Sequence, residues 1–332
     1  MNYIVFDLEW NQCPGGRAGE HPRMPFEIIE IGAVRLDEEF KLTGEFRRLV
    51  KPKLYTKLHK YIRDILSYDE EVLKNEGIPF KDACSDFLEW CDEGSNDGYV
   101  FCTWGPSDLH TLQNNMDFYN MPRMEFPLRF YDVQQIYAEK YSKTHSVCKL
   151  EKAITHLKLD EDRPYHAAIN DAYYTARVMQ DGGLGDFGEK YVYDTYRHPK
   201  KSTQNIHDFH DGIFEEILGE YESKREALQD KHVTDIRCSH CGKKTTKVIK
   251  TFQLNNNTCM GVGKCFKHGR MLSTVKFRPA SDSMDTVFVI KKVVPINKSR
   301  FNEVKKRRTL IAEKKRERDR KYRERKLDAE EE

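Results

Sequence analysis

The sequence predicts an α/β domain with a mixed β-sheet, then a small β domain with a cysteine cluster, and last a strongly basic segment. Apolar runs of β-formers open the chain, and helical patterns alternate with strands after them. From about residue 301 the composition is dominated by Lys, Arg and Glu. We therefore expect an α/β domain at 1–185, a polar and partly helical linker at 186–232, the small β domain at 233–300 and a basic helical or disordered tail at 301–332.

Three strands are expected near the start of the chain. Residues 3–10, 26–36 and 45–51 form apolar runs rich in β-formers, and Pro52 ends the third run. The connections between these runs are short, which favours an antiparallel meander. The α/β domain should therefore begin with three strands that pair in sequence order.

Helices and strands alternate in the rest of this domain. Helical patterns are expected at 80–93, from Ser107 onward, at 149–157 and at 167–180, and buried strands at 99–104 and 128–132. Ser107 could cap the second of these helices through its hydroxyl group. Three strands followed by alternating helices and strands are typical of an α/β domain with a mixed sheet.

The linker and the small β domain differ in composition. Within the linker, Ile213, Ile217 and Tyr221 recur every four residues, which indicates a helix. Residues 233–300 are richer in Val and Thr, which indicates strands. Residues 305–326 of the tail contain 13 Lys or Arg and four acids, with too few apolar residues to pack. The tail either contacts phosphates without sequence preference or only keeps the chain in solution.

The overall composition excludes several classes of protein. Hydrophobic residues make up 38% of the 332 residues, enough for a core, and the formal net charge is only +2. No run of 18 apolar residues is present, so we expect no membrane span. The first residues lack the basic start of a signal peptide, and the nine cysteines are too few for a disulfide scaffold. We expect a cytoplasmic protein.

Two acids lie close together on the first expected strand. Asp7 and Glu9 are two residues apart, so both side chains should point to one face, opposite Ile4, Phe6 and Leu8. Two ionised carboxylates side by side repel each other and are costly to desolvate. A divalent cation such as Mg²⁺ would compensate their charge, since it prefers oxygen ligands. The alternative is an edge strand with two solvated acids, but the apolar run around them argues against an edge.

Three further residues, Asp108, His166 and Asp171, indicate a functional site only when they are considered together. Asp108 and Asp171 each lie early in an expected helix, where an acid commonly complements the helix dipole. His166 lies five residues before Asp171, and a single His is commonly a structural or surface residue. Each has this simpler explanation when it is considered alone.

Taken together, these residues belong to segments that occur in a characteristic order. The segments are FDLEW at 6–10, EIIEIGAV at 27–34, TWGPSDLHTLQNN at 103–115, YDVQQIY at 131–137 and YHAAINDAYYTARV at 165–178. This arrangement resembles the DEDDh exonuclease superfamily, which includes ribonuclease T and the proofreading subunit of bacterial DNA polymerase III. The resemblance covers about residues 1–182 and is greatest to the branch that trims RNA 3′ ends.

The resemblance implies a ribonuclease-H-like fold and a specific set of site residues. The carboxylates that would bind two Mg²⁺ or Mn²⁺ ions belong to Asp7, Glu9, Asp108 and Asp171. His166 would be the general base, since a neutral imidazole can take the proton of an attacking water. Many family members carry Thr directly after the Glu of the first motif, where it helps to hold the terminal nucleotide. This chain has Trp10 there, and we expect Trp10 to pack rather than to stack on a nucleotide.

The expected reaction is removal of nucleotides from single-stranded nucleic acid 3′ ends by hydrolysis with two metal ions. We favour RNA over DNA because of the branch that the chain resembles. A DNA-proofreading exonuclease that works with a polymerase is a second interpretation. A catalytically inactive nucleic-acid-binding regulatory protein is a third, although a degenerate site tends to lose at least one of the acids that this chain retains.

The cysteine cluster indicates a second, softer metal site. Cys238 and Cys241 form a C-x₂-C pair, and Cys265 and His268 form a C-x₂-H pair that 23 residues separate from the first. This spacing is typical of a structural, tetrahedral Zn²⁺ site in a zinc-ribbon-like domain. Cys259 is an alternative to His268 as the fourth ligand. The remaining alternative is a set of free thiols in a domain without metal.

Overall fold

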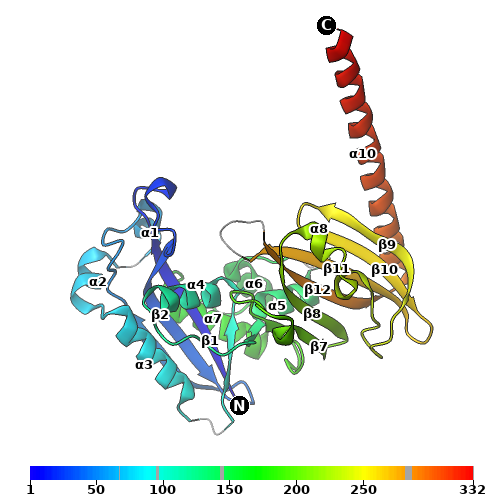
Figure 1. The fold of residues 1–332 in the computed structure, drawn as a ribbon. Coiled ribbons are helices and arrows are strands. Elements are labelled where there is room, and N and C mark those ends of the chain that lie inside the picture. The colour runs from blue at the N-terminus through cyan, green and yellow to red at the C-terminus, as the bar shows by residue number, and fades with distance from the viewer. Residues whose placement is uncertain (67, 95–96, 143–145, 281–285, 332) are drawn as a thin grey trace. The chain divides into compact units, whose positions relative to one another are not determined.

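The computed structural model describes residues 1–331 except 67, 95–96, 143–145 and 281–285 (Figure 1). The chain divides into two compact units, Met1–Arg197 and His198–Glu332. No helix among the described residues has the length and apolar character needed to cross a bilayer.

The first unit is built around one mixed sheet, as the sequence predicts. Its strands are β1 (Asn2–Gln12), β2 (Phe26–Leu36), β3 (Leu42–Leu49), β4 (Tyr99–Thr103), β5 (Arg129–Asp132) and β6 (Val192–Tyr193). The order across the sheet is β3-β2-β1-β4-β5-β6. The first three strands form the expected antiparallel meander, β4 and β5 run parallel to β1, and β6 is antiparallel to β5. Strand β1 is therefore central in the sheet, although its pairing with β4 ends at Val5, before Asp7 and Glu9.

Helices cover both faces of this sheet. They are α1 (Lys60–Ile65), α2 (Glu70–Glu76), α3 (Phe80–Asp92), α4 (Ser107–Phe118), α5 (Val133–Tyr141), α6 (Leu150–Leu157) and α7 (Ala168–Asp181), with a short 3₁₀ turn η1 (Arg17–Gly19). Ile4, Phe6 and Leu8 pack in one core with residues of α3 and α4. Val5 packs in a second core with residues of α5, α6 and α7. The period of two in β1 therefore sets which of its side chains meet α7. Ser107 is the first residue of α4, and Pro106 rather than Ser107 occupies the cap position.

The second unit contains a fully antiparallel six-stranded sheet. Its strands are β7 (Ile206–His210), β8 (Ile213–Tyr221), β9 (Thr246–Asn255), β10 (Thr258–Cys265), β11 (Gly269–Pro279) and β12 (Val287–Ile296). Their order is β7-β8-β12-β11-β10-β9. The helical elements are η2 (Ser202–Gln204), α8 (Lys224–Ala227), α9 (Lys231–Thr234) and the long α10 (Lys298–Glu331). The expected β domain and the helical form of the basic tail are present (Figure 1).

The expected polar linker at 186–232 is wrong as a structural description. The sequence boundary between the two units falls after Arg197. Strands β7 and β8 lie within the segment for which a linker is expected. Ile213, Ile217 and Tyr221 lie on β8 rather than on a helix. A spacing of four is a multiple of the strand period of two, so it fits one face of a strand as well as one face of a helix. The second unit consequently begins well before residue 233.

A buried lysine on β12 forms hydrogen bonds to β8 and to the segment that follows it in the sequence. Lys291 on β12 is 1% exposed, and its Nζ donates to Glu216 Oε2 on β8 at 2.6 Å. The same Nζ donates to the carbonyl oxygens of His232 at 2.5 Å and Asp235 at 2.7 Å. These bonds satisfy all three ammonium protons, which is what a buried lysine requires. They also fix the segment that leads into Cys238.

Helix α7 approaches β2 so closely that only glycine fits at position 32. A Cβ atom on Gly32 would lie 2.0 Å from the backbone nitrogen of Ile169 and 2.2 Å from the carbonyl carbon of Ala168. Both are backbone atoms, so no side-chain rotation relieves the overlap. Gly32 is the register partner of Asp7 on β1. The glycine thus allows the start of α7 to lie next to the acids of β1.

We expect Gly32→Ala to destabilise the first unit by about 1–3 kcal/mol or more, because α7 must move away from the sheet. Thermal denaturation followed by circular dichroism measures the change. Gly44→Ala on β3 is the matched control, since its nearest neighbour would be Trp90 Cζ2 at 3.4 Å, an ordinary contact. A melting temperature for Gly32→Ala equal to that of the unaltered chain would contradict the close packing.

Candidate active site

Three carboxylates meet where α7 begins. Asp7 and Glu9 project from β1, and Asp171 lies in the first turn of α7. One carboxylate oxygen from each residue lies within 4.8 Å of those of the other two. This grouping follows from the period-two geometry of β1 and from the close approach at Gly32. The structure therefore brings three of the four sequence-predicted acids into one cluster.

The fourth acid lies beside this cluster and is held by the backbone of β1. Asp108 on α4 is 5% exposed, and its Oδ1 accepts a hydrogen bond from the Leu8 N–H at 3.1 Å. The pairing of β1 with β4 ends at Val5 and Cys102, so the later Leu8 N–H is satisfied by Asp108 instead of a strand. The Asp108 charge also raises the pKa of Asp7. Asp108 is thus fixed next to the acids of β1.

His166 is joined to the cluster through its backbone. Its N–H donates to Asp171 Oδ2 at 3.3 Å, and its φ of 65° lies in the left-handed region. His is one of the residue types enriched there. This turn leaves the imidazole exposed to solvent at the start of α7. The ring is therefore accessible to a water molecule or a substrate.

The pKa values of all four acids are raised, which favours their protonated forms. Burial and then the neighbouring charges of Asp171 and Glu30 raise the pKa of Glu9 to about 8. Burial raises the pKa of Asp108 and of Asp171 to about 7, although backbone hydrogen bonds to each lower it. Burial, Asp108 and Asp171 raise the pKa of Asp7 well above its usual value. Ionisation of these acids is therefore unfavourable unless a cation compensates their charge.

This donor set fits a hard divalent cation. All of its side-chain donors are carboxylate oxygens, which Mg²⁺ and Mn²⁺ prefer. Asp171 Oδ1 is buried and has no hydrogen-bond partner in the described part of the chain, so it is available as a ligand. A bound cation would also offset the burial and the repulsion that raise these pKa values.

A fifth carboxylate, not expected from the sequence, lies next to the site. Glu30 on β2 is the register partner of Glu9, and its side chain is fully buried. Arg47 Nε donates to Glu30 Oε1 at 2.8 Å. The Glu30 charge contributes to the raised pKa values of Asp7, Glu9 and Asp171. The available signal was a charged residue inside the apolar run at 26–36, since a buried acid there needs a partner.

Trp10 lies at an irregularity of β1 and packs against the sheet's core. The register with β2 shifts between Glu9 and Trp10. Trp10 is partly buried against the core formed with α3 and α4, and its ring centroid lies 5.9 Å from that of Phe26. The expectation that Trp10 packs is therefore consistent with its contacts.

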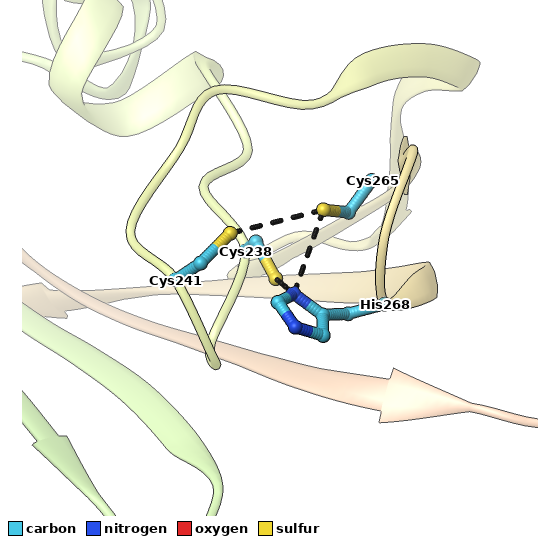
Figure 2. A group of neighbouring side chains, drawn as sticks. All are labelled: Cys238, Cys241, Cys265 and His268. Atoms are coloured by element: carbon cyan, nitrogen blue, oxygen red, sulfur yellow. Dashed lines mark hydrogen bonds between the residues drawn. The ribbon is translucent and has the colours of Figure 1, made fainter.

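Figure 2 shows the second cluster, which lies in the second unit. Cys238 Sγ lies 3.3 Å from His268 Nδ1, Cys265 Sγ lies 3.7 Å from the same nitrogen, and Cys241 Sγ lies 3.8 Å from Cys265 Sγ. A tetrahedron with ligands roughly 2.0–2.3 Å from its centre has edges of about 3.3–3.8 Å. The observed separations match that geometry. The four residues come from the loop before β9 and from the turn between β10 and β11.

The fifth candidate ligand is excluded from this cluster by its position. Cys259 is buried in a different core group with Val275, Phe277 and Val289. The four-residue group instead contains His268. Backbone N–H groups of His268 and Lys267 lower the pKa of Cys265 to about 6, which favours the thiolate form that binds metal.

Comparison with known proteins agrees with this geometry. The model of a protein family, RNase_T, described as Exonuclease, matches residues 4–179. The match confirms the exonuclease resemblance expected from the sequence motifs. No curated protein sequence matches the chain.

Several solved structures are similar to the chain at low identity. The nuclease domain of 3′hExo, a DEDDh family member bound to rAMP, is 20% identical over 55% of this chain and 92% of its own, with a TM-score of 0.46. Cell-death related nuclease 4 (CRN-4) is 19% identical over 54% and 62%, with a TM-score of 0.45. Exonuclease I is 12% identical over 83% and 55%, with a TM-score of 0.46.

We expect Mg²⁺ to stabilise the first unit more at pH 8 than at pH 5. The folded-state pKa values of Glu9, Asp108 and Asp171 are raised to about 8, 7 and 7, so stability present near pH 4 is lost as the pH rises through these values. A cation reverses that loss, by about 2–3 kcal/mol at roughly a hundred times its dissociation constant. Melting temperatures with and without Mg²⁺ at both pH values measure the effect, and Asp7→Asn should reduce it. An equal shift at both pH values would show that the acids are not the binding site.

Proposed function

Because the chain belongs to the exonuclease family, whose model covers more than half of its length, we propose that it removes nucleotides from the 3′ ends of single-stranded nucleic acid. The observation that carries the proposal is the convergence of Asp7, Glu9 and Asp171 on one point. The motif resemblance favours the DEDDh type, and within it RNA over DNA. A single strand is the expected substrate because one strand end must enter a narrow site.

The acids and the histidine have separate roles in this proposal. Asp7, Glu9, Asp108 and Asp171 would hold two Mg²⁺ or Mn²⁺ ions, which when bound activate a water and neutralise phosphate charge. Asp171 also accepts the backbone N–H of His166, so the two residues keep a fixed relation. The exposed His166 imidazole accepts the proton of the attacking water on a ring nitrogen. His166 must be neutral to do this.

Two other functions compete with this proposal. Proofreading beside a polymerase uses the same chemistry and differs in its DNA substrate and its protein partner. A catalytically inactive binding protein is disfavoured because the full set of acids is retained and concentrates uncompensated charge. Such a charge destabilises a fold that does not need to bind a cation.

The test is a gel assay on 5′-labelled single-stranded RNA and DNA of matched sequence. We expect the unaltered chain to shorten the strand stepwise from its 3′ end with Mg²⁺ or Mn²⁺ and not in metal-free buffer. Asp7→Asn should reduce the rate by at least about 10²-fold, since it removes a charged metal ligand. Retention of the strand without shortening under every condition would support the inactive binding protein instead. The faster substrate decides between RNA and DNA.

The same assay tests His166. His166→Ala should lower the rate by about 10²–10⁴-fold if its ring accepts the proton. The rate of the unaltered chain should fall as the pH drops below about 6, because only a neutral imidazole can accept the proton. The remaining activity of His166→Ala should decline less over the same range, because only the carboxylates still take up protons. A histidine with a purely structural role would lower the melting temperature without changing the shape of the pH profile.

We also propose that Cys238, Cys241, Cys265 and His268 bind one structural Zn²⁺. The ion would hold the loop before β9 against the turn between β10 and β11. Removing such an ion leaves these segments without a common anchor.

We expect one zinc per chain by elemental analysis, and loss of that zinc in Cys238→Ser. The variant should lower the stability of the second unit by several kcal/mol. Cys259→Ala is the matched control, since this cysteine lies in another core group, and it should keep the zinc. Zinc loss in Cys259→Ala but not in Cys238→Ser would reverse the assignment of ligands.

A further inference from the structure

The turn between β10 and β11 carries an aromatic side chain that has no role in the fold. We define the hairpin tip as Lys264–Arg270, which ends β10, forms the turn and begins β11. Phe266 at its centre is 99% exposed, the largest exposed fraction of any large apolar side chain in the described part of the chain. It belongs to none of the core groups of the second unit. Its ring therefore contributes no packing to the folded chain.

The residues around Phe266 are positively charged. The hairpin tip contains Lys264, Lys267 and Arg270 and no acid. Lys264 and Arg270 are direct register partners on adjacent strands, and like charges in that arrangement destabilise a sheet. None of the three forms an ion pair with another described residue, whereas Lys244 and Lys247 nearby are both paired with Asp235. No described acid thus compensates the charge of the hairpin tip.

The hairpin tip is also held in place at its base. Cys265 and His268 directly flank Phe266 and Lys267, and both belong to the cluster drawn in Figure 2. The Arg270 guanidinium lies over the Phe301 ring, 4.5 Å from its centroid. An aromatic ring on a fixed turn loses little conformational entropy when it binds a partner.

We propose that the hairpin tip is a second contact for single-stranded nucleic acid, in which Phe266 stacks on an unpaired base and Lys264, Lys267 and Arg270 lie beside phosphates. A stacking aromatic surrounded by cations is the common solution for binding single strands without sequence preference. A duplex offers few exposed base faces, so the contact selects unpaired strands. This inference rests on the proposed function for its choice of ligand, but the contact does not involve the acids of the first unit.

The test measures the affinity of the full chain for a fluorescent single-stranded 12-mer by anisotropy. All proteins carry Asp7→Asn so that the strand stays intact. We expect Phe266→Ala to weaken binding about 5- to 100-fold. Phe266→Trp should bind within about twofold of the parent chain, and Phe266→Leu should resemble Phe266→Ala because it keeps apolar bulk without a ring. Binding of a duplex of the same sequence should not change.

A charge variant tests the other half of the contact. Lys267→Gln should weaken binding and reduce the slope of log affinity against log salt concentration by about 0.7. Because Phe266 and Lys267 are exposed, these variants should keep their zinc content and melting temperature. Those two measurements separate a lost contact from a lost fold.

The outcomes distinguish this inference from the proposed function. If the chain with its native Asp7 degrades single strands but Phe266→Ala in the Asp7→Asn background binds as the parent does, the contact is overturned and the exonuclease remains. If Phe266→Ala weakens binding while the chain with native Asp7 degrades nothing, the contact is supported and the proposed activity fails. Unchanged affinity together with a change in oligomeric state would assign Phe266 to a second copy of the chain and overturn the inference.

Discussion

The candidate active site depends on one close approach between backbones. At Gly32 the start of α7 lies so near β2 that a methyl group would overlap three backbone atoms of Ala168 and Ile169. Since Gly32 pairs with Asp7, the same contact that closes the core also places Asp171 beside the acids of β1. The position of the site is therefore a consequence of packing: the residue that has no side chain determines where the charged side chains meet.

This packing places several carboxylates close together, and hydrogen bonds and an ion pair from the surrounding structure compensate their charge only in part. Leu8 N–H and His166 N–H donate to Asp108 and Asp171, and Arg47 pairs with Glu30. Glu9 receives no comparable partner among the described residues, and burial together with the neighbouring charges of Asp171 and Glu30 raises its pKa to about 8. Sites that concentrate like charge are commonly functional, because such an arrangement is unfavourable unless a ligand compensates it. Stability and cation binding are thus linked in the first unit.

Much of this could be read from the sequence, and the failures have physical reasons. The face shared by Asp7 and Glu9 follows from the strand period, and the ligand spacing around Cys238 and Cys265 is local, so both were predictable. The spacing of four in β8 predicts a helix as readily as a strand, because it satisfies both periods. Glu30 was missed because its importance comes from its register with Glu9, a long-range pairing that one sequence does not reveal. The exposure of Phe266 likewise depends on how the turn is folded.

The strand order of the second unit has a consequence for biosynthesis. Strand β8, the second strand of the unit in sequence, pairs with β12, the last one. This pairing can therefore form only after β12 has been synthesised. On a ribosome, β7 and β8 emerge first and can form only a two-stranded hairpin, which is marginally stable alone. Glu216 stays without Lys291 until β12 has left the exit tunnel. The first unit can thus fold while translation continues, whereas the second can complete its sheet only after β12 has been made.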